Sequence, residues 1–333
     1  MTGAAVRADV PRRSFKIVSA ALLGLALAAY LGYSFIYVRY TTALLQYPFD
    51  YDQGEGFELN DSVLLARGEW PYRSNEVYPF YSSNYPPLYH LALVPFVWAF
   101  GPAYWYGRLL SFLATLVAAG AIAYAVHRRT RDKPISALAG LAFLASNYVY
   151  HIGPLFRQHI SMVMFEALAV VILIPLGRGD TPTDRRRLFW GLLCLLAAGY
   201  TKQLAYATVA ACLLFIIGMG WRRGLIVAVG FTAVAGALFG LINIATSGQW
   251  WVNTILANIN EFVPGQAQGL YLQWLDLHLV LICLAALWGL IELSRRRVPL
   301  EVLWLIVAVI NGISSGKWGA GEAYFTTAVA AVC

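Results

Sequence analysis

Residues 105–133 read WYGRLLSFLATLVAAGAIAYAVHRRTRDK, an apolar run that ends in a dense basic cluster. The run up to about residue 126 is as long as the roughly 20 residues that a helix needs to cross a bilayer. The positive-inside rule places the basic cluster that follows on the cytoplasmic side. This stretch therefore predicts a membrane-spanning helix together with its direction.

The composition of the whole chain agrees with this prediction. Of the 333 residues, 59% are hydrophobic and 12% are charged, and the mean hydropathy is +0.62. Soluble domains carry roughly 25% charged residues. The four cysteines lie inside apolar runs without metal-ligand spacing, so we interpret them as small buried side chains. We predict an all-α polytopic membrane protein.

The basic residues mark one side of the membrane. Seventeen of the 24 Lys and Arg residues fall in five clusters, and the rule places every cluster in the cytoplasm. The clusters lie at 7–16, 128–133, 178–187, 222–223 and 295–297. The N-terminus is then cytoplasmic, and the high pI reflects contact with membrane lipids rather than with nucleic acid.

Charge alternation sets the number of spans. Residues 1–333 are predicted to form a single transmembrane domain of about nine spans and the start of a tenth. Residues 188–219 lie between two cytoplasmic clusters, so they form two short spans or a re-entrant hairpin with Lys202 at its turn. The tenth span begins near residue 321 and stops at Cys333, and we expect the chain to be C-terminally incomplete. The expected spans are 17–38, 105–126, 134–151, 158–177, the pair in 188–219, 224–246, 270–293 and 299–314.

Residues 39–104 form the largest predicted non-cytoplasmic loop. A span at 86–101 would move the basic cluster that follows to the outside, so we predict an interfacial helix there. The loop holds seven of the 17 acidic residues and many tyrosines and tryptophans. These side chains indicate either an aromatic belt with solvated acids between its members or a site for a sugar.

Five further cations lie at the predicted outer ends of spans. An ionisable group at that depth is costly unless it is paired or hydrated. The side chains either reach individually to lipid headgroups or converge on an anionic group such as a lipid phosphate. These residues are Arg39, Arg108, Arg157, Lys202 and Lys317.

Six short motifs occur in a fixed order along the chain. They are DQGEG (52–56), GEWPY (68–72), YPPLYHL (85–91), GRLLS (107–111), GYTKQ (199–203) and GKWGAGEAYF (316–325). This series resembles the GT-C membrane glycosyltransferases, in particular the bacterial branch similar to protein O-mannosyltransferases and lipid A aminoarabinose transferases. The resemblance implies a GT-C type transmembrane helical bundle with interfacial juxtamembrane helices in the first outer loop. It also implies an integral protein of the bacterial cell membrane.

The implied reaction moves a sugar from a polyprenyl-phosphate-linked donor to an acceptor hydroxyl outside the cytoplasm. The acceptor is a lipid, a protein or a polysaccharide. The family's acidic motif falls on Asp52 and Glu55, which makes 39–104 the catalytic loop. Inversion at the anomeric carbon needs one base. We expect that base to be Asp52, with Glu55 as a sugar ligand or the base itself, and Asp50 as a bystander.

The other candidate residues divide by role. For the donor phosphate we expect Lys202, Arg157, Lys317 and Arg108. For the substrate we expect Tyr85, Tyr89, His159, Glu322 and Tyr324, with a pairing of Glu322 and Lys317 as the alternative for that carboxylate. Asp52 and Glu55 also fit a capping box that opens a helix at about 57–67, which Gly68 would end.

One departure from the family pattern concerns the residues after the third span. The family often has Arg-x-Asp there, whereas this chain has Arg157-Gln158-His159. A divalent metal held by His151, His159 and Asp52 has only weak support, and we expect no metal and no cofactor. Two alternatives to the transferase stay open. They are a flippase or transporter for lipid-linked sugars and a non-catalytic relative that binds lipid carriers.

Overall fold

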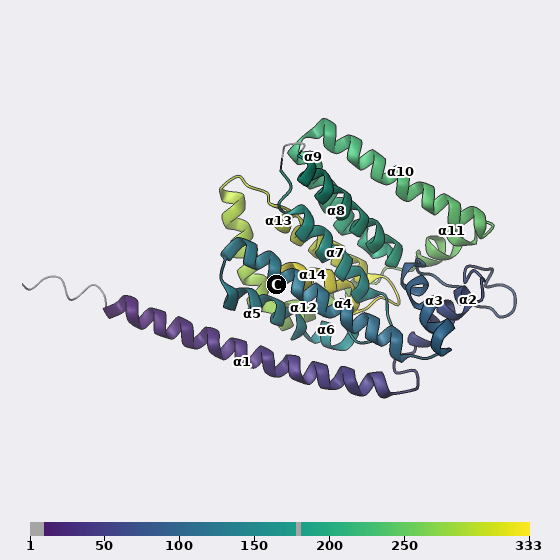
Figure 1. The fold of residues 1–333 in the computed structure, drawn as a ribbon, viewed down its shortest axis with the longest axis horizontal. Helices are drawn as coiled ribbons and strands as arrows, with labels where there is room; N and C mark the ends of the chain where they lie inside the picture. The colour runs from purple at the N-terminus through teal and green to yellow at the C-terminus, as the bar shows by residue number, and fades with distance from the viewer. Residues whose placement is uncertain (1–9, 178–180) are drawn as a thin grey trace, which may run out of the picture.

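The computed structural model describes residues 10–177 and 181–333, and these residues fold into helices joined by turns (Figure 1). Within those ranges the only β-type pairing is an isolated bridge between Phe262 and Lys317. Arg7 and Arg178 of the predicted basic clusters lie outside the described residues, as do the side chains of Arg12 and Arg13. The predicted all-α fold class is confirmed.

Long helices alternate with short ones along the chain. The α-helices are α1 (Val10–Gln46), α2 (Glu55–Ala66), α3 (Leu88–Phe100), α4 (Trp105–Thr130), α5 (Lys133–Leu144), α6 (Asn147–Ile152), α7 (His159–Leu173), α8 (Pro182–Thr201), α9 (Tyr206–Met219), α10 (Trp221–Ala245), α11 (Gln249–Thr254), α12 (Pro264–Ser294), α13 (Leu300–Asn311) and α14 (Thr326–Val332). The 3-10 helices are η1 (Gln203–Ala205), η2 (Leu256–Asn258), η3 (Gly312–Gly316) and η4 (Glu322–Phe325).

Four of these helices, α1, α4, α10 and α12, are long and apolar enough to cross a membrane. Shorter apolar helices fill the rest of the bundle, including α5, α7, α9 and α13. The span expected at 134–151 is interrupted, because α5 ends at Leu144 and α6 begins at Asn147. The protein is therefore an integral membrane protein, while the full number of spans stays a prediction.

The segment 188–219 forms two helices that meet at Lys202. Thr181 caps α8 by accepting the backbone N–H of Asp184, and Pro182 occupies the first turn, where its missing N–H costs nothing. Lys202 has an extended backbone (φ −155°, ψ 132°) between α8 and η1. The turn at Lys202 that the charge pattern predicts is therefore present.

Helix α2 begins earlier than the sequence suggested. It runs from Glu55 to Ala66, two residues ahead of the expected start, and Gly68 follows its end with φ +77°. The capping-box interpretation is wrong, because no side chain caps the helix and the backbone oxygen of Asp52 accepts the N–H of Glu55 instead. The carboxylate of Asp52 is thus left for another partner.

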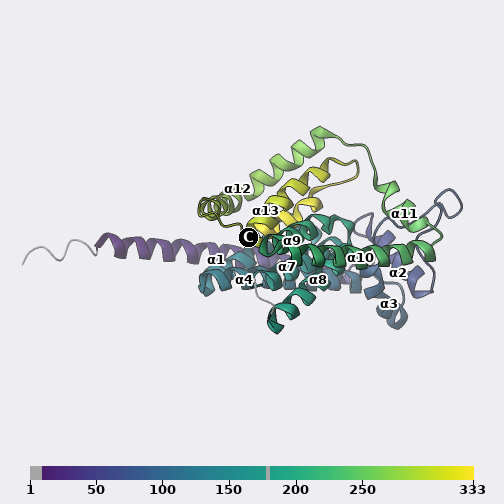
Figure 2. The same cartoon turned by 90° about the horizontal axis from the view of Figure 1, so that it is seen from above.

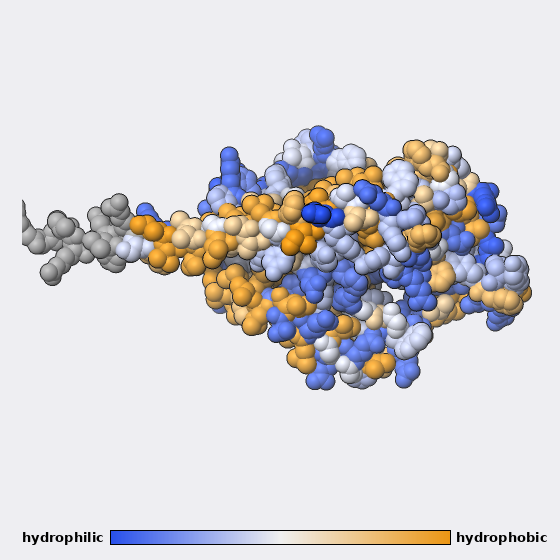
Figure 3. Space-filling view, turned by 90° about the horizontal axis from the view of Figure 1, so that it is seen from below, coloured by the Kyte–Doolittle hydropathy of each residue, from blue (hydrophilic) through white to orange (hydrophobic). Residues whose placement is uncertain are grey.

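The core of the bundle lies where α4, α7, α8, α9, α13 and α14 pack together. Within this core the buried acid Glu166 on α7 accepts hydrogen bonds from Thr208 on α9 and Thr327 on α14 at 2.7 Å each. Helices α1 and α10 lie at the periphery (Figures 1 and 2). Apolar side chains line α1 on the molecular surface (Figure 3), as expected for a helix that faces lipid.

Three short helices, α2, α3 and α11, gather at one end of the bundle. Figure 1 shows α2, α3 and α11 together there, whereas the connections between α4 and α5, α9 and α10, and α12 and α13 lie at the other end. Three of the basic clusters, 128–133, 222–223 and 295–297, lie at or beside these connections. The acidic loop and the basic clusters are therefore separated by the length of the bundle.

Candidate functional site

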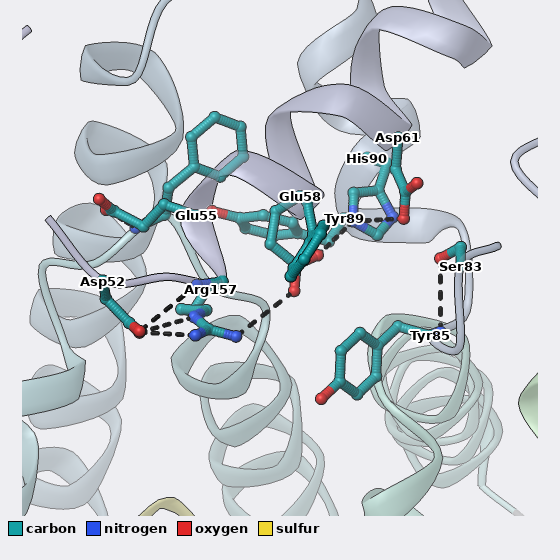
Figure 4. A network of polar contacts seen from close by, with 12 residues as sticks. Asp52, Glu55, Glu58, Asp61, Ser83, Tyr85, Tyr89, His90 and Arg157 are labelled. Atoms are coloured by element: carbon teal, nitrogen blue, oxygen red, sulfur yellow. Dashed lines mark hydrogen bonds and ion pairs between the residues drawn. The ribbon is translucent and has the colours of Figure 1, made fainter. Parts of the chain in front are cut away.

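The acidic motif meets the turn between α6 and α7 through one ion pair. The Nε and Nη2 atoms of Arg157 donate to Oδ2 of Asp52 at 2.9 and 2.6 Å (Figure 4). The same guanidinium lies 3.9 Å from Glu58 through Nη1. The side chain of Asp52 keeps 36% of its surface exposed, so it faces open space on its other side.

Gly54 makes this pair possible. A Cβ atom built on Gly54 would lie 1.9 Å from Nη2 and 2.0 Å from Cζ of Arg157. No carbon atom fits at such distances, so any other residue would push the guanidinium away from the backbone. The glycine in DQGEG therefore provides room for Arg157.

Glu55 points in the opposite direction and is fully buried against Arg108. The Nε and Nη2 atoms of Arg108 donate to its two carboxylate oxygens at 2.9 and 2.6 Å. The backbone N–H groups of Phe156 and Tyr51 donate to the same carboxylate at 2.8 and 3.0 Å. Four donors thus satisfy Glu55, and its carboxylate has no free lone pair for a substrate.

Arg108 is equally occupied. Its remaining N–H groups donate to the carbonyl oxygens of Leu44, Tyr47 and Phe49 at 2.7, 2.5 and 2.7 Å. A guanidinium has five N–H donors, and all five are bound. Contrary to the expectation from the sequence, Arg108 and Glu55 belong to the scaffold that joins the end of α1 to α2, and neither has a free group for donor or acceptor.

A second acidic cluster was missed at the sequence level. Glu58 and Asp61 lie one turn apart on α2, and His90 on α3 places Nε2 2.5 Å from Glu58 and 3.9 Å from Asp61 (Figure 4). All three side chains are at most 3% exposed. The i, i+3 spacing of the acids was visible in the sequence, but the helix that carries His90 is 32 residues away along the chain.

The ionisation of this cluster follows from its burial. Burial, with Glu58 close by, raises the pKa of Asp61 to about 6 against the opposing effect of His90. Burial alone would lower the pKa of His90, but the hydrogen bond and charge of Glu58, together with Asp61, raise it above its ordinary value. The cluster therefore retains protons more readily than the free side chains do.

These three residues are also the group that could hold a metal ion among the described residues. Their ligand atoms lie within 4.8 Å of one another, and two carboxylates with an imidazole suit a divalent transition metal. However, Glu58 already bonds to His90, and Tyr81 donates to Asp61 at 2.6 Å. These hydrogen bonds satisfy the facing atoms, so the fit to a metal is poor in this arrangement.

The metal ligands considered from the sequence do not come together. His151 bonds through Nδ1 to Glu322 at 2.7 Å, and Asp52 bonds to Arg157. His159 is buried at the start of α7 with an unpartnered Nδ1. The alternative pairing of Glu322 with Lys317 is also wrong, because Lys317 donates to Asn258 at 2.9 Å.

Lys202 is the unusual cation of the site. It is 2% exposed, and within the described ranges it has neither a hydrogen-bond acceptor nor an ion pair. Its Nζ lies 4.0 Å from the ring centre of Tyr85 and 5.9 Å from that of Tyr324. Burial, together with the charges of Arg157 and Lys317, lowers the pKa of Lys202 to about 7 against the opposing charge of Glu58. A buried ammonium group without a counter-ion is costly, so the binding of an anion beside it is favourable.

The expected substrate residues therefore divide into two groups. Tyr85 and Tyr324 lie beside Lys202, as a shared ligand site requires. Tyr89 does not, because its hydroxyl is buried against Gly107 and Ser111 and packs α3 on α4. The structure thus gives Tyr89 a scaffold position.

A polar cavity of about 500 Å³ opens between these elements. Asp52, Glu58, Asp61 and Arg157 contribute charged groups to its wall. Rings and carboxamides complete the wall, namely Phe57, Phe80, Tyr81, Tyr85, Gln53, Asn75, Asn84 and Asn253. Convergent polar groups beside aromatic faces suit a ligand with many hydroxyl groups.

An apolar groove of about 540 Å³ runs down the neighbouring face of the bundle. Its walls come from α8, α9, α10 and α11, and small residues such as Gly199 and Gly236 keep it open. Its polar end includes Gln203, which directly follows Lys202. The groove thus connects the depth of the bundle with the cationic end of the site.

The arrangement defines a helical membrane protein with a polar site at one end of the bundle and an apolar groove below it. The chain is similar to ArnT from Cupriavidus metallidurans in two crystal structures. The structure bound to undecaprenyl phosphate matches with a TM-score of 0.64 and the apo structure with 0.58, both at 17% sequence identity. The matches cover 93% and 94% of this chain but 58% of ArnT, so the chain spans little more than half of that protein's length.

This likeness confirms the predicted transmembrane helical-bundle fold, which the chain shares with ArnT, and at 17% sequence identity it shows the fold alone. No family model matches the sequence. A search of curated proteins also finds no match. The fold therefore rests on the three-dimensional likeness, and the chemistry of the site has to be argued from its residues.

Proposed function

We propose that the protein transfers a sugar from a polyprenyl-phosphate-linked donor to an acceptor hydroxyl, with inversion at the anomeric carbon. The observation that carries this proposal is Lys202, a buried and unpaired cation. Its Nζ lies against the ring of Tyr85, which lines the same polar cavity as Asp52 and Arg157, and the next residue, Gln203, lines the apolar groove. An anion with a long apolar tail fits these features together.

The donor is proposed to bind with its phosphate between Lys202 and Arg157 and its prenyl chain in the groove. Lys317 approaches the same region, since its charge lowers the pKa of Lys202. Cations aimed at the departing phosphate stabilise the charge that develops there in the transition state. The ArnT structure bound to undecaprenyl phosphate supports a carrier of this chemical class.

The sugar is proposed to occupy the polar cavity. Carboxylates accept hydrogen bonds from hydroxyl groups, and carboxamides both accept and donate them. The rings of Phe57 and Tyr81 offer flat surfaces to C–H groups. Asp52 takes the proton of the acceptor hydroxyl as that oxygen attacks the anomeric carbon. A positioned base of this kind typically contributes 10²–10⁴-fold to a rate.

The site is proposed to face away from the cytoplasm, with the N-terminus inside. This orientation follows from the basic clusters at the opposite end of the bundle and the positive-inside rule. Single cysteines at Ser74 and Ser294 test it by labelling with a membrane-impermeant reagent. The orientation requires labelling of the two positions from opposite sides.

The function is tested by reconstitution into liposomes with a panel of radiolabelled polyprenyl-phosphate sugars and candidate lipid, protein and polysaccharide acceptors. Transfer that falls at least 100-fold in Asp52→Asn, with the same amount of folded protein, is the expected result. Transfer that is unchanged in this variant would refute the assignment of the base. Movement of the donor across the bilayer without transfer would favour the flippase.

A further inference from the structure

We propose that Arg157 exchanges partners during the reaction, so that the donor phosphate takes it from Asp52 and thereby turns Asp52 into a base. This inference rests on the proposed function and adds an order of events to it. Without donor, Asp52 and Arg157 bind each other through Oδ2, and Oδ1 accepts the backbone N–H of Gly54 at 3.4 Å, so both oxygens of the carboxylate that would accept a proton have a donor. With donor, the phosphate competes for the same guanidinium.

The contacts of Arg157 define the exchange. Both hydrogen bonds to Asp52 go to one oxygen, Oδ2, and come from Nε and Nη2. The third nitrogen, Nη1, has only the 3.9 Å approach to Glu58. The guanidinium lies over Gly54, where no side chain obstructs it. It can therefore turn towards a new anion without displacing a neighbouring side chain on that face.

The positive charge of Lys202 favours the movement of the Arg157 guanidinium towards a phosphate. This cation has no ion pair among the described residues, and its Nζ lies 4.0 Å from the ring centre of Tyr85, which lines the same cavity as Arg157. The positive charges of Lys202 and Arg157 repel each other. A phosphate placed between them would remove that repulsion and bind to both. Asp52 cannot do the same, because it pairs with Arg157 alone. The donor phosphate is thus the stronger competitor for the guanidinium.

The chemical step balances once the exchange has occurred. The acceptor oxygen forms a bond to the anomeric carbon as the bond between that carbon and the phosphate oxygen breaks. The electron pair of the broken bond stays on the phosphate, which Arg157 and Lys202 hold. The hydroxyl proton passes to the carboxylate of Asp52. Donor therefore binds before the acceptor hydroxyl can be activated.

The exchange makes a prediction that a fixed Asp52–Arg157 pair does not make. If Asp52 competes with phosphate, its removal strengthens phosphate binding while it abolishes transfer. The full chain in lipid nanodiscs is titrated with undecaprenyl phosphate, and binding is followed calorimetrically. We expect Asp52→Asn to bind the probe about tenfold more tightly than the wild type, because two charge-assisted hydrogen bonds no longer hold Arg157.

Two controls separate competition from a general change in charge. Asp50→Asn removes a carboxylate of the same loop that is not bonded to Arg157, and it should change binding by less than twofold. In an Arg157→Gln background, Asp52→Asn should have no further effect. Thermal unfolding confirms that each variant is folded.

The outcomes distinguish this inference from the proposed function. A wild-type protein that does not bind undecaprenyl phosphate would refute the proposed donor. A wild type that binds, with Asp52→Asn binding equally or more weakly, would refute the exchange alone and leave the donor assignment standing. Equal strengthening by Asp50→Asn would likewise refute it, since the effect would then be one of loop charge.

Discussion

Gly54 lies directly beneath the guanidinium of Arg157, and the two residues are 103 positions apart in the chain. Their close approach allows Arg157 to reach Asp52 while it lies flat on the backbone. The glycine is therefore a part of the site although it contributes no functional group.

Replacing this glycine should impair the site more than the fold. In Gly54→Ala the new Cβ would overlap the guanidinium, so Arg157 should lose Asp52, and transfer should fall by at least tenfold. The thermal midpoint should change little, because Gly54 precedes α2. The matched control is Gly56→Ala, whose Cβ would meet the movable carboxylate of Asp50 at 3.0 Å and the hydroxyl of Tyr104 at an ordinary contact distance of 3.7 Å. Equal activities of the two variants would contradict this account of Gly54.

The Glu55–Arg108 pair should matter for stability rather than chemistry. Glu55→Gln leaves Arg108 as a buried cation without its counter-ion, which typically costs about 3–5 kcal/mol. The free energy of unfolding in lipid or detergent should fall accordingly, whereas Asp52→Asn should leave it nearly unchanged. The double variant Glu55→Gln, Arg108→Gln should recover part of the loss. If Glu55→Gln is as stable as the wild type but inactive, the result would contradict the scaffold role and favour a catalytic role for Glu55.

Donor binding should depend on pH through Lys202. Its pKa of about 7 in the empty site means that the neutral amine dominates above pH 7, while bound phosphate favours the charged form. Affinity for undecaprenyl phosphate should therefore weaken by about tenfold per unit between pH 7 and 9, a range in which the phosphate is already dianionic. Lys202→Arg retains its charge, and its affinity should stay flat over this range. A flat profile for the wild type would exclude this role for Lys202.

The packing of α2 against α3 should be more stable at mildly acidic pH than at alkaline pH. The pKa values of His90 and Asp61 are both raised in the folded protein, so the folded state binds more protons than the unfolded state. The stabilisation is complete below the unfolded pKa of each group and is lost as the pH rises through the folded pKa. Hydrogen exchange of the α2 and α3 amides, corrected for its intrinsic pH dependence, should be slower at pH 5.5 than at 8. His90→Gln should reduce that difference, and an undiminished difference would show that His90 is not its source.

The sequence predicts the features that depend on local patterns. Hydropathy and basic clusters determine the all-α membrane fold, and the alternation of those clusters places Lys202 at a turn. The same reasoning brings Asp52, Arg157 and Lys202 to one end of the bundle. Each of these inferences needs only the order of apolar and charged segments along the chain.

The pairings within the site depend on distances along the chain that no local pattern encodes. Glu55 and Arg108 are 53 residues apart, and neither shows in its own neighbourhood that it has a partner. From the sequence, Asp52 and Glu55 of DQGEG therefore both looked free to bind a substrate. In the structure Glu55 is buried in its pair with Arg108, whereas Asp52 faces the cavity. His90 was missed for the same reason, because its contact with Glu58 joins two helices across a long loop.

The five bound donors of Arg108 also show which positions in a related sequence would indicate a folded acidic loop and which would indicate the proposed reaction. Lysine has three donors on one atom and cannot take its place, so an arginine and a glutamate at these positions report that the acidic loop is folded. Asp52 and Lys202 are instead the residues to which the proposed reaction assigns the base and a phosphate-binding cation. A homologue with the first pair and without the second would keep the folded loop but lack the base and the phosphate-binding cation of the proposed reaction.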